Sequence, residues 1–180
     1  MKPTISTYLL RGRRDLLSET KQLAPRAMKH VNWSVNGRMP AVEITLTNTR
    51  GLAELAVKAE AELTGCTDKK TTGRALKGAT RHSRDAAGRA VARTDGSVLI
   101  LLNGDNHRTT KEVAVTLVHE LVHAMQFSRR GVRDRMIQSL RDEYGIEKQS
   151  RRDQREHQRL VEAEEREAYQ AEHIADDLLL

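Results

Sequence analysis

Hydrophobic and polar positions along the chain follow two periods, and each period predicts a different kind of element. Apolar residues that alternate with polar ones, or form a short continuous run, predict strands at residues 42–47, 89–93 and 97–102. Apolar residues at helical spacing predict helices over residues 52–63, 110–128, 132–143 and 158–179. These elements predict an α+β fold, in which a small, mainly antiparallel sheet packs on helices.

Turn residues and helix-capping residues delimit these elements. Thr109 and Glu112 form a capping-box pattern at the start of the helix predicted over 110–128, and Gly65 is a stop signal after the helix predicted over 52–63. Pro25 is expected to interrupt any helix between residues 13 and 30, which leaves one or two short helices there. Residues 69–96 are rich in Gly, Thr and Arg, which favours turns and short strands.

Length and composition restrict the classes of protein that the chain can belong to. A chain of 180 residues fits one domain, and 38% hydrophobic with 31% charged residues is polar but above the disordered regime. The single cysteine, Cys66, excludes an intramolecular disulfide. The N-terminus lacks the apolar run of a signal peptide, and no stretch approaches transmembrane length. We therefore expect a cytoplasmic protein with no membrane partner.

Charge is distributed unevenly along the chain. The formal net charge is +6, yet residues 160–180 carry −6, so residues 1–159 carry +12. A basic body favours acidic partners such as nucleic acid. Solvated, Arg-rich helix faces give the same charge without such a partner, and no aromatic residues interleave the Arg clusters. Nucleic-acid binding is therefore the second hypothesis.

The run His119-Glu120-Leu121-Val122-His123 is the strongest chemical signal in the sequence. On a helix, two residues four positions apart point about 40° apart, so both imidazoles can reach one metal ion. Chance would produce about 0.02 such patterns in a chain of this composition. The run therefore predicts two metal ligands, with Glu120 beside them as a base.

A catalytic zinc ion usually has three protein ligands, so a third must be found. Metzincin spacing is excluded because Gln126 and Arg129 occupy the positions of its Gly and His. On a helical wheel of the last helix, Glu167 lies in the middle of the apolar stripe, where an unpaired carboxylate is costly. A metal ion or an arginine partner would remove that cost. Glu164 is the second choice, and His157 is a further candidate.

The residues around the two histidines and those around Glu167 resemble a known family. The run from Thr116 to Met125 resembles the extended zinc-metallopeptidase (zincin) signature, and the run from Glu167 to Glu172 looks like the glutamate-ligand helix of small gluzincin-type peptidases. The resemblance implies one zinc ion on His119, His123 and Glu167, with Glu120 as general base. It also implies a zincin-like single domain over residues 1–180, with a helical and turn region at 1–40 and a catalytic core at 41–180.

The expected activity is hydrolysis of a protein or peptide substrate by a zinc-activated water. A further donor must stabilise the oxyanion, and the sequence leaves four candidates open: Tyr144, His157, Tyr169 and His173. Three alternatives remain: a basic nucleic-acid-associated protein without catalysis, a SprT-like protease that acts on DNA-bound proteins, and a phage or effector protease with one dedicated target. The sequence does not name the substrate.

Overall fold

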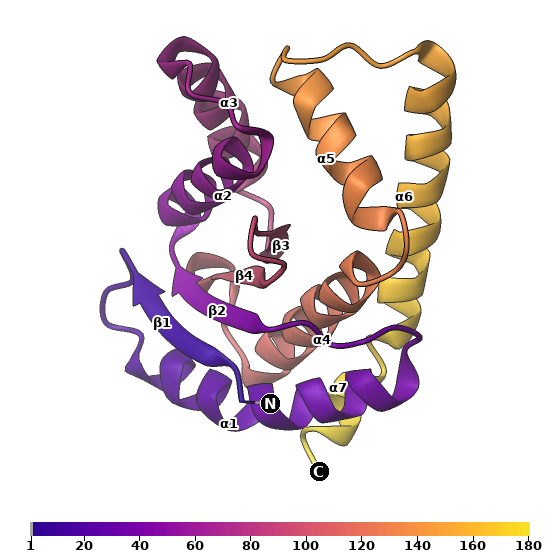
Figure 1. The fold of residues 1–180 in the computed structure, drawn as a ribbon. Helices are drawn as coiled ribbons and strands as arrows, with labels where there is room; N and C mark the ends of the chain where they lie inside the picture. Colours follow the sequence, from indigo (N-terminus) through magenta and orange to yellow (C-terminus); the bar gives the residue numbers. More distant parts are fainter. Residues whose placement is uncertain (1) are drawn as a thin grey trace.

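Four strands form one mixed sheet in the order β1-β2-β4-β3 in the computed structural model, which describes residues 2–180 (Figure 1). The strands are β1 (Thr4–Tyr8), β2 (Val42–Thr47), β3 (Gly88–Ala92) and β4 (Val98–Asn103). The β1–β2 and β2–β4 pairs are parallel, and only β3 runs antiparallel to its neighbour, β4. The fold is α+β as predicted, but the prediction of a mainly antiparallel sheet is wrong.

Long connections between the strands explain the parallel pairing. Parallel neighbours need a crossover, and helices provide it here. Helix α1 (Arg14–Ser34) joins β1 to β2; helices α2 (Thr49–Thr64) and α3 (Lys69–His82), together with β3, lie between β2 and β4. The strand predicted over 97–102 is β4, and its continuous apolar run is typical of a strand that is covered on both faces.

The two faces of β4 pack into two hydrophobic clusters. Ile100 and Leu102 face the larger cluster, where α1 and helix α4 (Thr110–Phe127) cover the sheet. Leu99 and Leu101 face the smaller cluster, which α2 completes with Leu52 and other apolar residues. Helix α4 is thus packed between the sheet and the C-terminal helices, and this position makes it the central helix of the fold (Figure 1).

The N-terminal region departs from the prediction in two ways. It supplies strand β1, which the hydropathy pattern did not indicate, and α1 runs without interruption through Pro25. Pro25 lies on the exposed side of α1. The carbonyl of Lys21, which loses its amide partner to the proline, can therefore be satisfied by water.

The segment after β2 contains one predicted helix and one unpredicted helix. Helix α2 begins after Asn48, whose side chain accepts from the Gly51 amide, and ends at Gly65 in the left-handed region, at φ 73°. Helix α3 begins after Asp68, which accepts from the Thr71 amide at 2.7 Å. No residue of α3 is buried. Its sequence therefore lacks the apolar stripe from which helices are predicted.

The C-terminal part of the chain forms three helices after α4. Helix α5 (Val132–Glu143) is found as predicted. The single helix predicted over 158–179 is instead a long helix α6 (Arg151–Ala171) and a short helix α7 (Ile174–Asp177), separated at Glu172 and His173. Within residues 2–180, no helix combines the length and the apolar composition that crossing a bilayer requires.

Candidate metal centre

Helix α4 fixes the direction of His119, Glu120 and His123. Its predicted capping box is present: Thr109 accepts from the Glu112 amide, and Glu112 accepts from the Thr109 amide. The buried His107 precedes the helix, and its Nε2 atom lies 3.0 Å from the hydroxyl of Thr116 on α4. Eleven of the 18 residues of α4 are buried. A helix held on so many sides presents its polar side chains in fixed positions.

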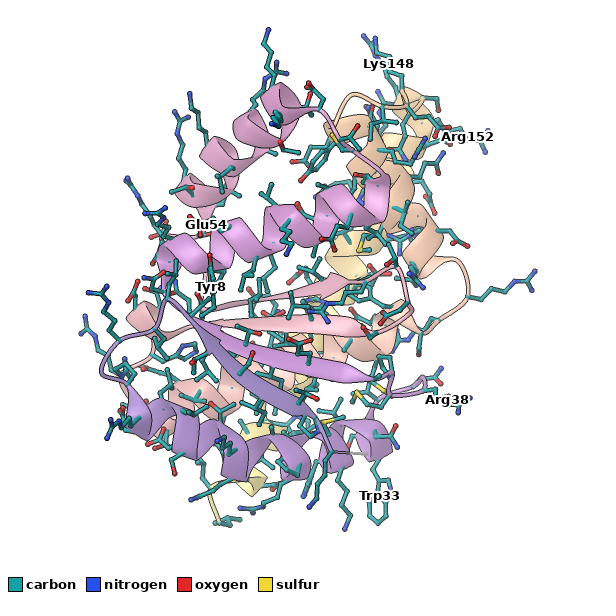
Figure 2. The ribbon with its side chains drawn as sticks, turned by 60° about the vertical axis from the view of Figure 1, so that its left-hand side comes forward. Tyr8, Trp33, Arg38, Glu54, Lys148 and Arg152 are labelled. Carbon is teal, nitrogen blue, oxygen red and sulfur yellow. The ribbon has the colours of Figure 1, made fainter. Side chains whose placement is uncertain are left out.

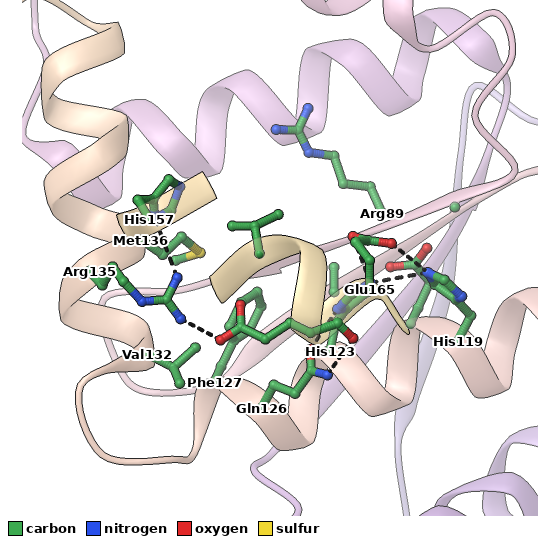
Figure 3. Close-up of a pocket in the computed structure, with 15 residues that line it drawn as sticks. Arg89, His119, His123, Gln126, Phe127, Val132, Arg135, Met136, His157 and Glu165 are labelled. Atoms are coloured by element: carbon green, nitrogen blue, oxygen red, sulfur yellow. Dashed lines mark hydrogen bonds and ion pairs between the residues drawn. The ribbon is translucent and has the colours of Figure 1, made fainter. Parts of the chain in front are cut away.

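Both histidines direct one ring nitrogen to a common point, where Glu165 of α6 joins them (Figure 3). The two Nε2 atoms are 3.1 Å apart. The Glu165 carboxylate lies 3.6 Å from Nε2 of His119 and 3.4 Å from Nε2 of His123, through its two different oxygens. The side chains come from two helices that are separate in the sequence, and they form a His-His-Glu cluster that fits an HExxH-type site.

The other ring nitrogen of each histidine binds a specific acceptor, and this fixes the tautomers. Nδ1 of His119 is 2.9 Å from the carboxylate of Glu172. Nδ1 of His123 is 2.8 Å from Oε1 of Gln126, whose Nε2 donates to the Glu164 carbonyl at 2.9 Å and to Glu167 at 3.0 Å. The side-chain nitrogen of Gln126 faces two acceptors, so the amide oxygen must be the atom that faces His123. Nδ1 of His123 is therefore the donor in that hydrogen bond. Each Nδ1 then carries the proton, and each Nε2 presents a lone pair.

This arrangement has the chemistry of a cation site. Four acceptors converge, namely two Nε2 lone pairs and two carboxylate oxygens, and no N–H or O–H group of residues 2–180 donates to them. Burial lowers the pKa of His123, which favours its neutral form. Ligands at about 2.05 Å in a tetrahedron are about 3.3 Å apart. The two Nε2 atoms are 3.1 Å apart, and each has an oxygen of Glu165 at 3.4–3.6 Å, so all three side chains lie within reach of one cation.

Glu120 lies beside the cluster in a nearly closed position between α4 and β3. It is 6% exposed and lines the same cleft as the two histidines. Burial raises its pKa to about 8, the charge of Glu165 adds to this, and the Ala90 amide and Arg89 act against it. Gly88 makes this approach possible, because a Cβ there would come within 2.9 Å of the Glu120 side chain. The side chain is thus a buried carboxyl that is sensitive to any nearby positive charge.

Glu167 does not join the cluster. Both of its oxygens accept from the Arg129 guanidinium at 2.7 Å, and this contact lowers the pKa of Glu167. An arginine partner was the alternative that the sequence left open for this residue. Glu164 pairs with Arg135, and its backbone carbonyl binds Gln126.

The geometry of α6 explains why Glu165, and not the predicted Glu167, joins the two histidines. The prediction took residues 158–179 as one helix, but α6 ends at Ala171. The buried face of α6 is therefore centred between Glu164 and Ala168, and Glu165 and Glu167 lie on opposite edges of it, each about 80° away. The edge with Glu165 faces the histidines, and Glu172, two turns further on, shares that edge.

A cleft of about 440 Å³ extends from the cluster between α4, α5, α6 and β3 (Figure 3). One end is polar and contains the histidines, Glu120 and Glu165. The other end has an apolar wall formed by Phe127, Val132, Met136 and Val161. Arg135 and His157 line this second end, where the Arg135 guanidinium lies 3.3 Å from Nδ1 of His157.

The structure brings two of the four oxyanion candidates near the site. The ring of Tyr169 packs edge-on against His119 with centroids 4.9 Å apart, and His157 lines the cleft. Tyr144 is buried and directs its hydroxyl to Glu60 of α2, and His173 is exposed beside the Gln170 carbonyl. Neither Tyr144 nor His173 lines the cleft.

Sequence reasoning did not assign a role at the site to Glu165, Glu172 or Gln126. The spacing of Glu165 and Glu172 by seven residues on one helix edge was a signal for a pair acting on the same target. Gln126 follows His123 by three residues and faces it across one turn. Comparisons with known protein families, curated proteins and solved structures gave no match.

Proposed function

We propose that the protein is a zinc-dependent metallopeptidase in which His119, His123 and Glu165 hold the metal ion and Glu120 is the general base. The observation that carries the proposal is the convergence of four acceptor atoms without a donor, beside a buried carboxyl in an open cleft. Two imidazoles and one carboxylate form a ligand set that suits zinc. Three protein ligands leave a position for water, which is typical of catalytic and not of structural zinc.

The outer hydrogen bonds support the same conclusion. Histidines that bind zinc usually donate their second ring nitrogen to a carboxylate or carbonyl, which fixes the ring and its tautomer. Glu172 does this for His119, and the Gln126 amide oxygen does it for His123. Arg129 in turn holds Glu167, which holds Gln126. In this interpretation, Glu167 supports the metal site from outside its ligand shell.

The residues around the cleft provide the remaining steps of amide hydrolysis. When bound, zinc supplies an acidified water and polarises the scissile carbonyl. Glu120 takes the proton of the attacking water and passes it to the leaving nitrogen. A bound cation lowers the pKa of Glu120, which returns the carboxyl to its ionised, basic form at neutral pH. The donor to the oxyanion stays open between Tyr169, which packs against His119, and His157, which lines the far end of the cleft.

The position of β3 supports a peptide as the substrate. Strand β4 lies inside the sheet, between β2 and β3, so it has no free edge for a peptide. Strand β3 is the terminal strand, and its residues Gly88, Arg89 and Ala90 line the cleft. An extended peptide can add to such an edge through backbone hydrogen bonds. It would then pass in front of Glu120 and the two histidines.

The decisive experiment separates metal binding from chemistry. Wild-type protein is expected to bind about one zinc ion per chain and to hydrolyse an unfolded protein such as casein, with loss of hydrolysis in chelator. Glu120→Gln is expected to keep the zinc ion and to lower hydrolysis at least about 100-fold, because an amide cannot accept the proton. Metal analysis and a casein assay on the same preparations measure both. Unchanged hydrolysis in Glu120→Gln would exclude Glu120 as the base.

Gln126→Leu tests the outer hydrogen bond at His123. Leucine keeps the bulk but removes the acceptor, so both tautomers of His123 become accessible. Zinc affinity is expected to fall about 10- to 100-fold, the usual effect of losing an outer partner. Competition with a zinc indicator measures it. Gln126→Glu, which restores an acceptor, is expected to recover most of the affinity; equal loss in both variants would show that bulk and not the hydrogen bond matters.

A further inference from the structure

Helix α3 carries a straight stripe of positive charge on its outer face. The stripe consists of Lys70, Arg74, Lys77 and Arg81, all of them exposed. Spacings of four, three and four residues keep these side chains within an arc of about 60° and along about 16 Å of the helix axis. The opposite face of α3, with Ala75, Leu76 and Ala79 partly buried, lies toward the body of the protein. The stripe therefore lies on the exposed side of the helix, and Arg74 at its edge also lines a hollow that contains Glu60 and Glu143.

No ion pair within residues 2–180 compensates this charge, although Arg74 lies close enough to Asp68 to contribute to the lowered pKa of that carboxyl. Helix α3 contains no acidic residue, and none of the four cations lies within ion-pair distance of a carboxylate of residues 2–180. Like charges three and four positions apart repel on a helix surface, so the stripe weakens the helix that carries it. Other helices of the chain intersperse acids with their cations, as α5 and α6 do.

Two glycines border the stripe without a structural reason. Gly73 and Gly78 lie on its two sides, about 60° and 80° from Lys70. A Cβ at either position would meet nothing within 4 Å. Glycine inside a helix is less stable than alanine, and no packing contact requires it here. Gly73 lines a hollow between α2 and α3, and the half-buried Gly78 lines another that also contains Glu60 and Tyr144.

We propose that the α3 stripe binds the phosphate backbone of double-stranded nucleic acid without reading its sequence. A duplex presents one negative charge per about 1.7 Å of its axis, so a linear cation array meets phosphates along its whole length. Helix α3 contains no aromatic residue on which unpaired bases could stack, which disfavours a single strand. Its outer face carries no large apolar residue to insert into a bilayer, which disfavours a membrane surface.

A second group of exposed cations lies at the same end of the molecule. It surrounds the turn between α5 and α6, where Figure 2 shows Lys148 and Arg152 reaching into solvent. Arg151 and Arg155 are exposed beside them. Both α3 and this turn lie away from the chain termini (Figure 1). A duplex held by α3 could thus gain additional phosphate contacts at this turn.

Binding of a labelled 20-base-pair DNA duplex, followed by fluorescence anisotropy at several salt concentrations, tests the proposal. A variant that changes four cations to glutamine removes the stripe: Lys70→Gln, Arg74→Gln, Lys77→Gln and Arg81→Gln. It is expected to weaken binding at least about 100-fold at low salt, and the slope of log affinity against log salt is expected to decrease by about 3 to 4. An RNA duplex is expected to give the same result, since both present a phosphate backbone.

The control variant removes the same charge at another place. Its four exposed cations lie at or near α1 and form no ion pair with any carboxylate of residues 2–180: Arg11→Gln, Arg14→Gln, Lys21→Gln and Arg38→Gln. It is expected to change duplex binding less than about threefold, apart from the general effect of net charge. Equal weakening in both variants, wild-type affinity in the α3 variant, or equally tight wild-type binding to polyglutamate, a single strand or anionic vesicles would each overturn the proposal. All assays use the protein as isolated and measure duplex binding alone, so the result does not depend on hydrolysis.

Discussion

Replacing Glu165 with alanine is expected to weaken zinc binding on the order of 10³-fold and to abolish hydrolysis. Structural zinc sites with four ligands are worth about 10–16 kcal/mol, so one ligand contributes about 4 kcal/mol, or nearly three factors of ten in affinity. Glu165 is the only carboxylate that approaches Nε2 of both histidines among residues 2–180. Its loss leaves two imidazoles, which do not hold zinc firmly. Competition with a zinc indicator and a casein assay measure the two effects.

Glu167→Ala is the matched control, because Glu167 lies on the same helix and was the ligand expected from the sequence. Gln126 keeps the Glu164 carbonyl as a partner when Glu167 is removed. The zinc affinity of Glu167→Ala is therefore expected to fall at most about tenfold, at the lower end of the effect of outer partners. The reverse result, with zinc lost in Glu167→Ala and kept in Glu165→Ala, would show that α6 is rotated differently from the arrangement described above.

The local part of the site could be predicted from the sequence, because its signals are local. The capping box at Thr109 and the helical spacing of the apolar residues fix helix α4, and the two histidines lie four residues apart on it. Choosing the third ligand requires the direction of a second helix. A helical wheel gives the buried face of α6, but whether Glu165 or Glu167 faces His123 depends on how α6 crosses α4. The spacing of Glu165 and Glu172 marks one edge of α6, but the sequence does not show which edge faces α4, because that crossing is a property of the packed fold.

The direction of the strands had a signal that the prediction did not use. Residues 98–102 are apolar without alternation, which is typical of a strand buried on both faces, and long helices separate β1, β2 and β4. Both features indicate parallel pairing. Helix α3 had no such signal, because it buries no residue and contains two glycines. Its boundary at Asp68 rests on a single capping hydrogen bond.

Removing zinc is expected to loosen helix α6 selectively. Only Ala168 and Ala171 are buried along its 21 residues, so little hydrophobic burial holds it. Its other contacts are polar. Glu172 binds His119, Glu167 binds Arg129, and Glu165 lies beside the two histidines. Zinc at about 1,000 times its dissociation constant adds about 4 kcal/mol to the free energy of unfolding, which corresponds to about 8–16 °C in Tm for a chain of this size. Thermal unfolding with and without chelator measures the shift.

Hydrogen exchange locates the effect within the fold. Without zinc, the four acceptors face one another uncompensated, so the amides of residues 161–171 are expected to exchange up to about 1,000 times faster. Amides of β2 and β4 lie in the core of the sheet and are expected to keep their protection. Glu165→Ala is expected to exchange in the same way with and without chelator. Equal protection of α6 in both states of the wild type would mean that its packing on α4 is sufficient without the metal ion.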